Sequence, residues 1–244
     1  MSVLSVDLAY KSYADVGSVA LSCENCTIEC EFCELYGEDP PTPAEFVDNL
    51  CHLSDSVGAR VLLLDGPQGW KHPDNGLEHS RLCERELNTP AKTGLPGNVK
   101  PANYTPFVEF SIEVYQELTQ RGWHLFDDTT DCSGQRVLME SFPMSAWRVL
   151  GIQPLPSKRK ATGRDIIQRF GTLQSQFRLR TPRTPSHDEL QALVSGLGGI
   201  AFELGAEHCL QSNGRCPELL DGTWREGFIV NPRPAALWPE EVRK

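Results

Sequence analysis

The sequence lacks several features that would place it in a well-defined class. No apolar run approaches the roughly 20 residues of a membrane-spanning helix. The N-terminal stretch MSVLSVDLAY has neither a basic region nor a cleavage-like site, so we expect no signal peptide. The G-x-x-x-x-G-K-[ST] pattern of P-loop proteins and the G-x-S-x-G pattern of serine hydrolases are also missing. We therefore expect a cytoplasmic protein without membrane contact and without either of these chemistries.

An excess of basic charge is missing as well. The 244-residue chain has a net charge of −10, which disfavours a protein that coats nucleic acid with its whole surface. Positive charge is instead concentrated in residues 157–183, which hold eight basic residues against the single acid Asp165. This segment is either a solvated, mobile connection or a region that contacts phosphate.

Cysteine, in contrast, is plentiful and clustered. Four of the nine cysteines lie in CENCTIECEFC, residues 23–33, which suggests a zinc site. The flanking residues alternate between apolar and polar, as in a half-buried hairpin. A turn at Glu24-Asn25 would pair 23 with 26, 21 with 28 and 19 with 30, and would place Cys23, Cys26 and Cys30 on the apolar face with Cys33 on the other.

Along such a strand Cys26 and Cys33 lie roughly 24 Å apart, because each residue advances about 3.4 Å. Four thiolates so spread cannot bind one zinc ion. We therefore favour strand patterning over zinc binding at the Cys23–Cys33 cluster, and thiols over disulfides in a reducing compartment.

Hydrophobic periodicity and capping signals predict alternating strands and helices. Capping boxes begin two of the helices, one at Thr42 with Glu45 and one at Ser186 with Glu189. Three glycines within the last helix predict that another element packs closely against it. The predicted strands are 2–8, 16–22, 27–35, 60–67, 135–143 and 225–232, and the predicted helices are 42–57, 79–87, 105–121, 144–151, 162–177 and 186–204. This order predicts one α/β domain over residues 1–244, with a mixed sheet and helices on both faces.

Acidic residues end three of the predicted strands, namely Asp7, Asp65 and Glu140. If these strands are parallel, their side chains converge at one edge of the sheet, where open α/β sheets bind ligands. Asp188, in the first turn of a helix, would add a fourth carboxylate. Clustered carboxylates repel one another unless cations compensate them, and oxygen ligands suit Mg²⁺ or Mn²⁺. Each acid also has a purely structural explanation, as a turn, a helix-dipole partner or half of an ion pair.

An ordered set of segments resembles the ribonuclease-H-fold family catalogued as domain of unknown function 429, described as predicted nucleases. The segments are VLSVDLA, VLLLDGPQGW, RLCERELN, VLMESFPMSAWRVLG, SHDELQALVSGLGGIAF and EGFIVNP. The resemblance implies a ribonuclease-H-like mixed five-stranded sheet of order 3-2-1-4-5, with strand 2 antiparallel and an additional strand at the C-terminal end. The cysteine-rich hairpin is not part of the family pattern.

The resemblance also implies a site and a reaction. Asp7, Asp65 and Asp188 would form an acidic triad that holds two Mg²⁺ or Mn²⁺ ions, with Glu140 as a fourth member. The expected reaction is hydrolysis of phosphodiester bonds in nucleic acid. Phosphate contacts would come from Arg81, Arg85, Lys158, Arg159 and Lys160. His187 would either transfer a proton or lie exposed at the start of its helix.

Two other functions stay open. The same fold occurs in actin-like and sugar-kinase ATPases, although Leu8 and Ala9 occupy the positions where those proteins usually place Gly and Ser or Thr. A non-catalytic scaffold or partner-binding protein is the other alternative, and it is consistent with the acidic net charge. Binding of Mg²⁺ or Mn²⁺ near Asp7 would distinguish a nuclease from a scaffold.

Overall fold

The structure is a computed structural model that describes residues 2–129, 134–240 and 242–243. Its strands are β1 (Ser2–Asp7), β2 (Gly17–Glu24), β3 (Thr27–Cys33), β4 (Ala59–Asp65), β5 (Lys92–Thr93), β6 (Val99–Lys100), β7 (Trp123–Leu125), β8 (Arg136–Ser141), β9 (Leu179–Arg180), β10 (Leu210–Leu220) and β11 (Thr223–Pro232). Its α-helices are α1 (Pro43–Ser56), α2 (Leu82–Leu87), α3 (Thr105–Gln120), α4 (Pro143–Val149), α5 (Gly163–Gln176) and α6 (His187–Glu203). Short 3₁₀ helices are η1 (Tyr13–Asp15), η2 (Ala102–Tyr104), η3 (Glu207–Cys209) and η4 (Ala235–Leu237).

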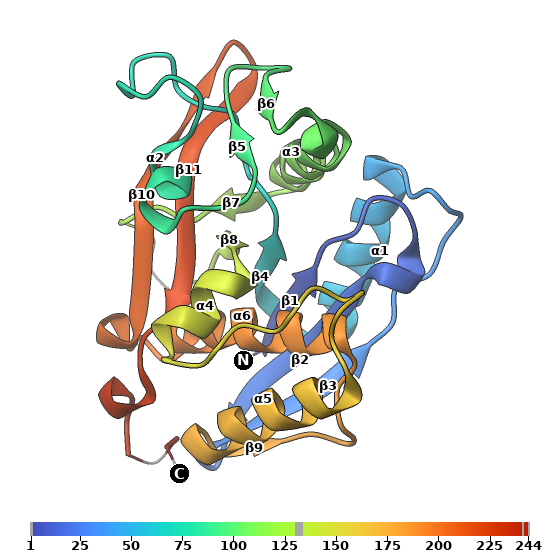
Figure 1. The fold of residues 1–244 in the computed structure, drawn as a ribbon, viewed down its shortest axis with the longest axis vertical. Coiled ribbons are helices and arrows are strands. Elements are labelled where there is room, and N and C mark those ends of the chain that lie inside the picture. Colours follow the sequence, from blue (N-terminus) through green and yellow to red (C-terminus); the bar gives the residue numbers. More distant parts are fainter. Residues whose placement is uncertain (1, 130–133, 241, 244) are drawn as a thin grey trace.

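A mixed sheet in the order β10-β11-β8-β4-β1-β2-β3-β9 forms the centre of the molecule, and β7 also pairs with β8. Strands β1, β4 and β8 are parallel to one another, whereas β2 is antiparallel to both β1 and β3. Helix α6 crosses one face of the sheet, and α1 and α3 lie on the other face (Figure 1). The predicted α/β architecture with a mixed central sheet is confirmed.

Each face of the sheet has its own hydrophobic core. Val3 and Leu63 belong to the cluster that includes the apolar side of α6, whereas Leu4 and Leu64 belong to the cluster that includes α1 and α3. Central parallel strands are buried on both faces, which explains why they read as continuous apolar runs. Because successive side chains alternate between faces, this division also fixes the direction in which each strand-end carboxylate points.

The glycines of α6 allow this helix to lie directly on the sheet. A Cβ atom at Gly196 would come within 2.5 Å of the Leu21 side chain, and one at Gly199 would come within 2.5 Å of Leu63. Real Cβ atoms essentially never make such contacts, so a larger residue at either position would force the neighbouring side chains to shift. The prediction of a close neighbour is confirmed at these two positions.

The predicted helix starts are found at the capping residues. The Thr42 hydroxyl accepts a hydrogen bond from the backbone N–H of Glu45, and Ser186 and Glu189 form the reciprocal capping box that opens α6. Helix α2 is shorter than predicted. It begins at Leu82 rather than at residue 79, because residues 72–81 form a loop fixed by side chains from other elements.

The cysteine-rich hairpin forms, but its turn lies one residue later than predicted. Glu24 pairs with Thr27, so the turn residues are Asn25 and Cys26, both with positive φ. Two consecutive left-handed residues match the twist of the flanking strands. Cys30 is buried and Cys23 packs against the core, as predicted, whereas the placement of Cys26 on the apolar face is wrong.

Strands β5, β6, β7, β9 and β10 were not predicted. The first four have only two or three residues each, too few for a periodic pattern. Strand β10 has eleven residues, but its sequence LQSNGRCPELL contains Gly and Pro and lacks alternation. Its pairing with β11 shifts register between Arg215 and Glu218, around the proline. Within the described ranges, no helix combines the length and hydropathy needed to cross a membrane.

Candidate functional site

Asp7 and Asp65 lie beside each other at the carboxyl ends of two adjacent parallel strands. Val6 is in register with Leu64, so the two aspartates follow at equivalent positions. Val3 and Leu63 lie an even number of residues before Asp7 and Asp65 on the same strands, and both belong to the core under α6. Because side chains alternate between the two faces, Asp7 and Asp65 also point to the face covered by α6. Their carboxyl groups share a hydrogen bond, which requires that one of them carries a proton.

The pKa values of both groups are raised. Burial raises the pKa of Asp7 well above its usual range, and the neighbouring charges of Asp65 and Asp188 raise it further. Burial raises the pKa of Asp65 to about 7, against an ordinary value of 3.8, with Glu140 contributing in the same direction. At neutral pH at least one of the two carboxyl groups therefore keeps its proton, as expected for two carboxyl groups at one site.

Asp188 approaches Asp7 from the first turn of α6. Asp7 is in register with Gly17 on the antiparallel strand β2, and a Cβ atom at Gly17 would lie 2.1 Å from the Asp188 carbonyl carbon. The missing side chain at Gly17 thus allows the start of α6 to lie against the end of β1. The sequence predicted Asp7, Asp65 and Asp188 as a group, and the structure brings all three into one neighbourhood.

Asp188 is already paired with cationic groups. Lys158 Nζ lies 2.5 Å from Asp188 Oδ2 and 2.6 Å from Asp15 Oδ1. His187 Nδ1 lies 2.8 Å from Asp188 Oδ1. Burial raises the pKa of Asp188, but the His187 and Lys158 hydrogen bonds outweigh it and hold this pKa below its ordinary value. Asp188 is therefore ionised, unlike the proton-sharing pair beside it.

His187 is held between two acceptors. Its second ring nitrogen, Nε2, lies 3.0 Å from the carbonyl oxygen of Pro156. The hydrogen bond with Asp188 raises the pKa of His187 above its ordinary value. The side chain is only 12% exposed, so the interpretation of His187 as an exposed residue at a helix start is wrong. Its protonated ring can donate to both acceptors.

Glu140 does not join this group. It is in register with Leu64, whose side chain lies in the core under α1 and α3, so Glu140 points away from the face that carries Asp7 and Asp65. Glu140 therefore lines the same pocket as Asp65, but from the opposite face of the sheet. Ser141 is in register with Asp65 and takes the place on the α6 face. The physical reason is the alternation of side chains, which a difference of one residue reverses.

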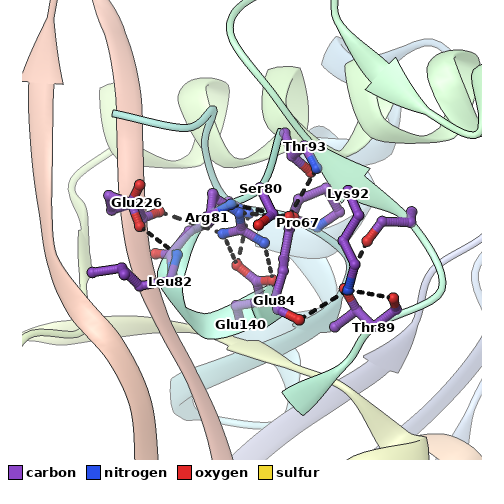
Figure 2. A network of polar contacts seen from close by, with 12 residues as sticks. Pro67, Ser80, Arg81, Leu82, Glu84, Thr89, Lys92, Thr93, Glu140 and Glu226 are labelled. Carbon is purple, nitrogen blue, oxygen red and sulfur yellow. Dashed lines mark hydrogen bonds and ion pairs between the residues drawn. The ribbon is translucent and has the colours of Figure 1, made fainter. Parts of the chain in front are cut away.

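Glu140 belongs instead to a buried ionic network with Arg81 (Figure 2). Arg81 Nη1 and Nη2 donate to the two Glu140 oxygens at 2.7 and 2.6 Å, and Arg81 Nε donates to Glu84 at 3.0 Å. The backbone N–H of Gln68 supplies a third donor to Glu140. Arg81 is 1% exposed, so its guanidinium is committed to these carboxylates rather than presented to phosphate in solution.

Glu226 fixes the loop that precedes α2. Its carboxylate accepts hydrogen bonds from the backbone N–H groups of His72 and Leu82 and from the Asn75 side chain, and the Leu82 contact is drawn in Figure 2. Glu226 has a positive φ within β11 and is fully buried. No local pattern indicates this role, because Glu226 lies between 144 and 154 residues along the chain from the three groups that it binds.

The other predicted phosphate contacts differ in availability. Arg85 lies exposed in the last turn of α2, and Arg159 and Lys160 lie exposed in a turn before α5. Lys158 is half-exposed and bound to Asp15 and Asp188. Further along the segment, ion pairs join Arg169 to Asp165, Arg180 to Glu29 and Arg183 to Glu189.

No three His, Cys, Asp or Glu residues in ranges 2–129, 134–240 and 242–243 lie in positions that hold a metal ion as they stand. The eight cysteines within these ranges are free thiols, and Cys132 lies outside them. In the candidate site, two features explain why the three carboxylates are not arranged as metal ligands. Two carboxyl groups face each other, and the third is bound by Lys158.

A pocket of about 610 Å³ opens beside Asp65. It lies at the carboxyl ends of β1, β4 and β8, and residues from the segments 89–93 and 103–107 also line it. Asp15, Arg81 and Glu140 also contribute to its wall. Most of this wall could not be predicted from the sequence, because its residues come from loops without periodic patterns.

Comparisons with known proteins give no assignment. No family model matches the chain, and neither the search of curated proteins nor the search of solved structures finds a match.

Proposed function

We propose that the protein is a divalent-metal-dependent phosphodiesterase that hydrolyses nucleic acid, built on a ribonuclease-H-like fold. The observation that carries this proposal is the Asp7–Asp65 pair, two hydrogen-bonded carboxyl groups with raised pKa values at the ends of adjacent parallel strands. The resemblance to the predicted nucleases of family 429 supports it. Such pairs are costly unless they serve a purpose, and residues with strongly shifted pKa values are concentrated at functional sites.

The sheet order supports the fold part of the proposal. The strands β3-β2-β1-β4-β8 follow one another with β2 antiparallel and the remaining central strands parallel. This arrangement agrees with the order 3-2-1-4-5 expected of a ribonuclease-H-like sheet. The hairpin β10-β11 and the strand β9 would then be additions at the two edges.

The donor groups fit a divalent cation. Asp7 and Asp65 present carboxylate oxygens, which Mg²⁺ and Mn²⁺ prefer, and a cation would replace the proton that they share. Asp188 would become a third ligand once Lys158 moves away from it. A bound divalent cation supplies positive charge for the transition state and lowers the pKa of water.

The neighbouring residues have separate tasks in this proposal. His187 holds the Asp188 carboxylate in place through the 2.8 Å contact. The exposed side chains of Arg159 and Lys160 attract the phosphate backbone to this edge. Arg81 and Glu140 position the wall of the site without contacting phosphate, because their charges neutralise each other.

The experiment is an Asp7→Asn substitution with two readouts. Mn²⁺ binding is measured by calorimetry, and cleavage is assayed on single-stranded, duplex and hybrid substrates. We expect wild type to bind Mn²⁺ and cleave at least one substrate, and Asp7→Asn to lose both activities by at least about 100-fold. Asp74→Asn, at an exposed position that does not line the pocket, is the matched control. A wild-type protein that binds no Mn²⁺, or an Asp7→Asn variant as active as wild type, would refute the assignment.

A non-catalytic scaffold is the second candidate, and one observation favours it. The Lys158 ammonium already forms ion pairs with both Asp188 and Asp15, so the chain itself supplies a cation at this position. In that case Mn²⁺ would not displace Lys158, and the same calorimetric titration would show no binding.

A further inference from the structure

The pocket beside Asp65 has aromatic walls that the proposed catalytic groups do not require. Tyr10, Tyr104, Phe107 and Phe142 all line it, and each side chain is partly exposed. The rings of Tyr10 and Phe107 lie 6.2 Å apart at an angle of 57°. Partly exposed aromatic rings around a cavity provide faces for stacking a flat ligand. The volume lies within the roughly 300–1,000 Å³ of small-molecule sites.

Two buried hydroxyl groups in the same wall lack hydrogen-bond partners. Ser141 Oγ and Thr93 Oγ1 have no partner among the described residues, although Ser141 is 1% exposed and Thr93 is fully buried. Both residues line the pocket. Ser141 lies at the end of β8, in register with Asp65 of β4, and Thr93 belongs to the segment 89–93. Buried hydroxyls are normally satisfied, and leaving one unpaired is costly. A ligand with polar edges would satisfy both.

The charges of the pocket determine how such a ligand lies. The interior holds Asp65 together with the Glu140 and Glu84 carboxylates and Arg81, and is acidic overall. Lys11 contributes an exposed ammonium group. A neutral ring with N–H donors suits the interior, whereas a phosphate suits the side of Lys11. An anionic ring is disfavoured, because it would face the carboxylates.

We propose that this pocket binds one unstacked nucleobase. The aromatic side chains stack on the base, and the hydroxyls of Ser141 and Thr93 bond to its polar edge. A base within a duplex is covered by its neighbours and exposes only its edges, so the ligand is a single-stranded or unpaired nucleotide. The inference deepens the proposed function, on which only its last step depends, namely that the base places its adjoining phosphodiester near Asp7 and Asp65.

The test measures base binding without relying on cleavage. The probes are 2-aminopurine riboside 5′-monophosphate and a single-stranded oligonucleotide with one 2-aminopurine, whose fluorescence falls when the base stacks. We expect saturable quenching by wild type. Tyr104→Ala should weaken binding roughly 5- to 150-fold, as for the loss of one stacking partner. Ala91→Trp should abolish binding by filling the pocket, since Ala91 lines it.

Two further variants separate binding from folding. Thr93→Val keeps the shape of the buried side chain and removes only the hydroxyl, and we expect a smaller but clear loss of affinity. Tyr36→Ala is the matched control, because Tyr36 is an aromatic residue that is 69% exposed and does not line the pocket. It should bind as wild type does.

The outcomes of the two proposals are distinguishable. Quenching that depends on Tyr104 and Thr93 supports the base pocket even if no substrate is cleaved, and in that case the nuclease assignment alone falls. Metal-dependent cleavage that is unchanged in Tyr104→Ala and Ala91→Trp overturns the base pocket and leaves the nuclease standing. Absence of quenching by wild type, or equal quenching by every variant, also overturns it.

Discussion

Two groups of acidic residues lie at the same edge of the sheet, on opposite faces, and their surroundings differ. On the face of α1 and α3, the Glu140 carboxylate accepts two hydrogen bonds from Arg81 and one from the Gln68 backbone. On the face of α6, Asp7 and Asp65 face each other and share a proton. Burial raises the pKa of Glu140 as well, but there the Arg81 guanidinium acts against it.

A structural carboxylate and a functional candidate differ in whether the chain itself balances their charge. Glu140 has its charge balanced within the chain, and removing either partner leaves an unpaired buried charge. The charges of Asp7 and Asp65 are not balanced by a partner in the same way, so the two groups need a proton or a cation between them. All three acids lie near the end of a strand, but Glu140 is one residue earlier in register, so it faces the other side and meets different partners.

The largest effect should come from breaking the balanced group. Glu140→Gln is nearly isosteric but leaves the Arg81 guanidinium without its main counter-charge. We expect the free energy of unfolding to fall by about 3–5 kcal/mol. Urea denaturation followed by circular dichroism measures it. A loss below about 1 kcal/mol would contradict the view that the Arg81–Glu140 pair is structural.

The matched substitution on the other face should have the opposite sign. Asp65→Asn removes a charge that the folded protein disfavours, so we expect it to stabilise the metal-free protein at pH 8 by about 1–3 kcal/mol. The measurement is the same denaturation with a chelator present. Destabilisation of the same size as in Glu140→Gln would show that the two groups do not differ in kind.

The pH dependence of stability follows from the raised pKa of Asp65. The folded state holds this proton up to about pH 7, whereas the unfolded chain loses it near the ordinary value of 3.8. The folded state therefore binds more protons between these values, and stability falls as pH rises from about 4 to about 7. The contribution is about 2–4 kcal/mol. Denaturation at pH 5 and pH 8 should show it in wild type, and Asp65→Asn should reduce the difference.

A smaller effect should separate the two cationic partners. Lys158→Met frees Asp188, so we expect Mn²⁺ to bind roughly 2- to 5-fold more tightly, in line with the energy of a partly exposed ion pair. Arg81→Met should not tighten Mn²⁺ binding, because Glu140 points to the other face. Calorimetric titration of both variants with Mn²⁺ tests these two expectations. Tighter binding by Arg81→Met would indicate that Glu140 is a metal ligand.

The smallest effect should come from an exposed ion pair far from this edge. Arg180 lies 2.7 Å from Glu29 and its side chain is 73% exposed. We expect Arg180→Ala to cost no more than about 0.5 kcal/mol, because solvent and salt screen such pairs. Urea denaturation gives the value. A cost near that of Glu140→Gln would show that burial does not explain why the Arg81–Glu140 pair contributes more to stability.

Much of the fold could be predicted from local patterns. Apolar runs located the central strands, and the residues Thr42 and Ser186 marked helix starts that the structure confirms. Local signals worked because capping and periodicity act over a few residues. Strand β10 was missed because a Gly and a Pro interrupt it, and the hairpin turn was misplaced by one residue because only backbone conformation at Asn25 and Cys26 decides it.

The sequence by itself determined that Asp7 and Asp65 end buried strands and that Asp188 begins a helix, since these features depend on neighbouring residues alone. Only the tertiary structure decided which carboxylates meet. Gly17 admits Asp188 to the end of β1, strand register turns Glu140 to the other face, and Arg81 and Lys158 arrive from distant loops. The physical reason is that charge balance at a buried site depends on partners remote in sequence, which no local pattern records.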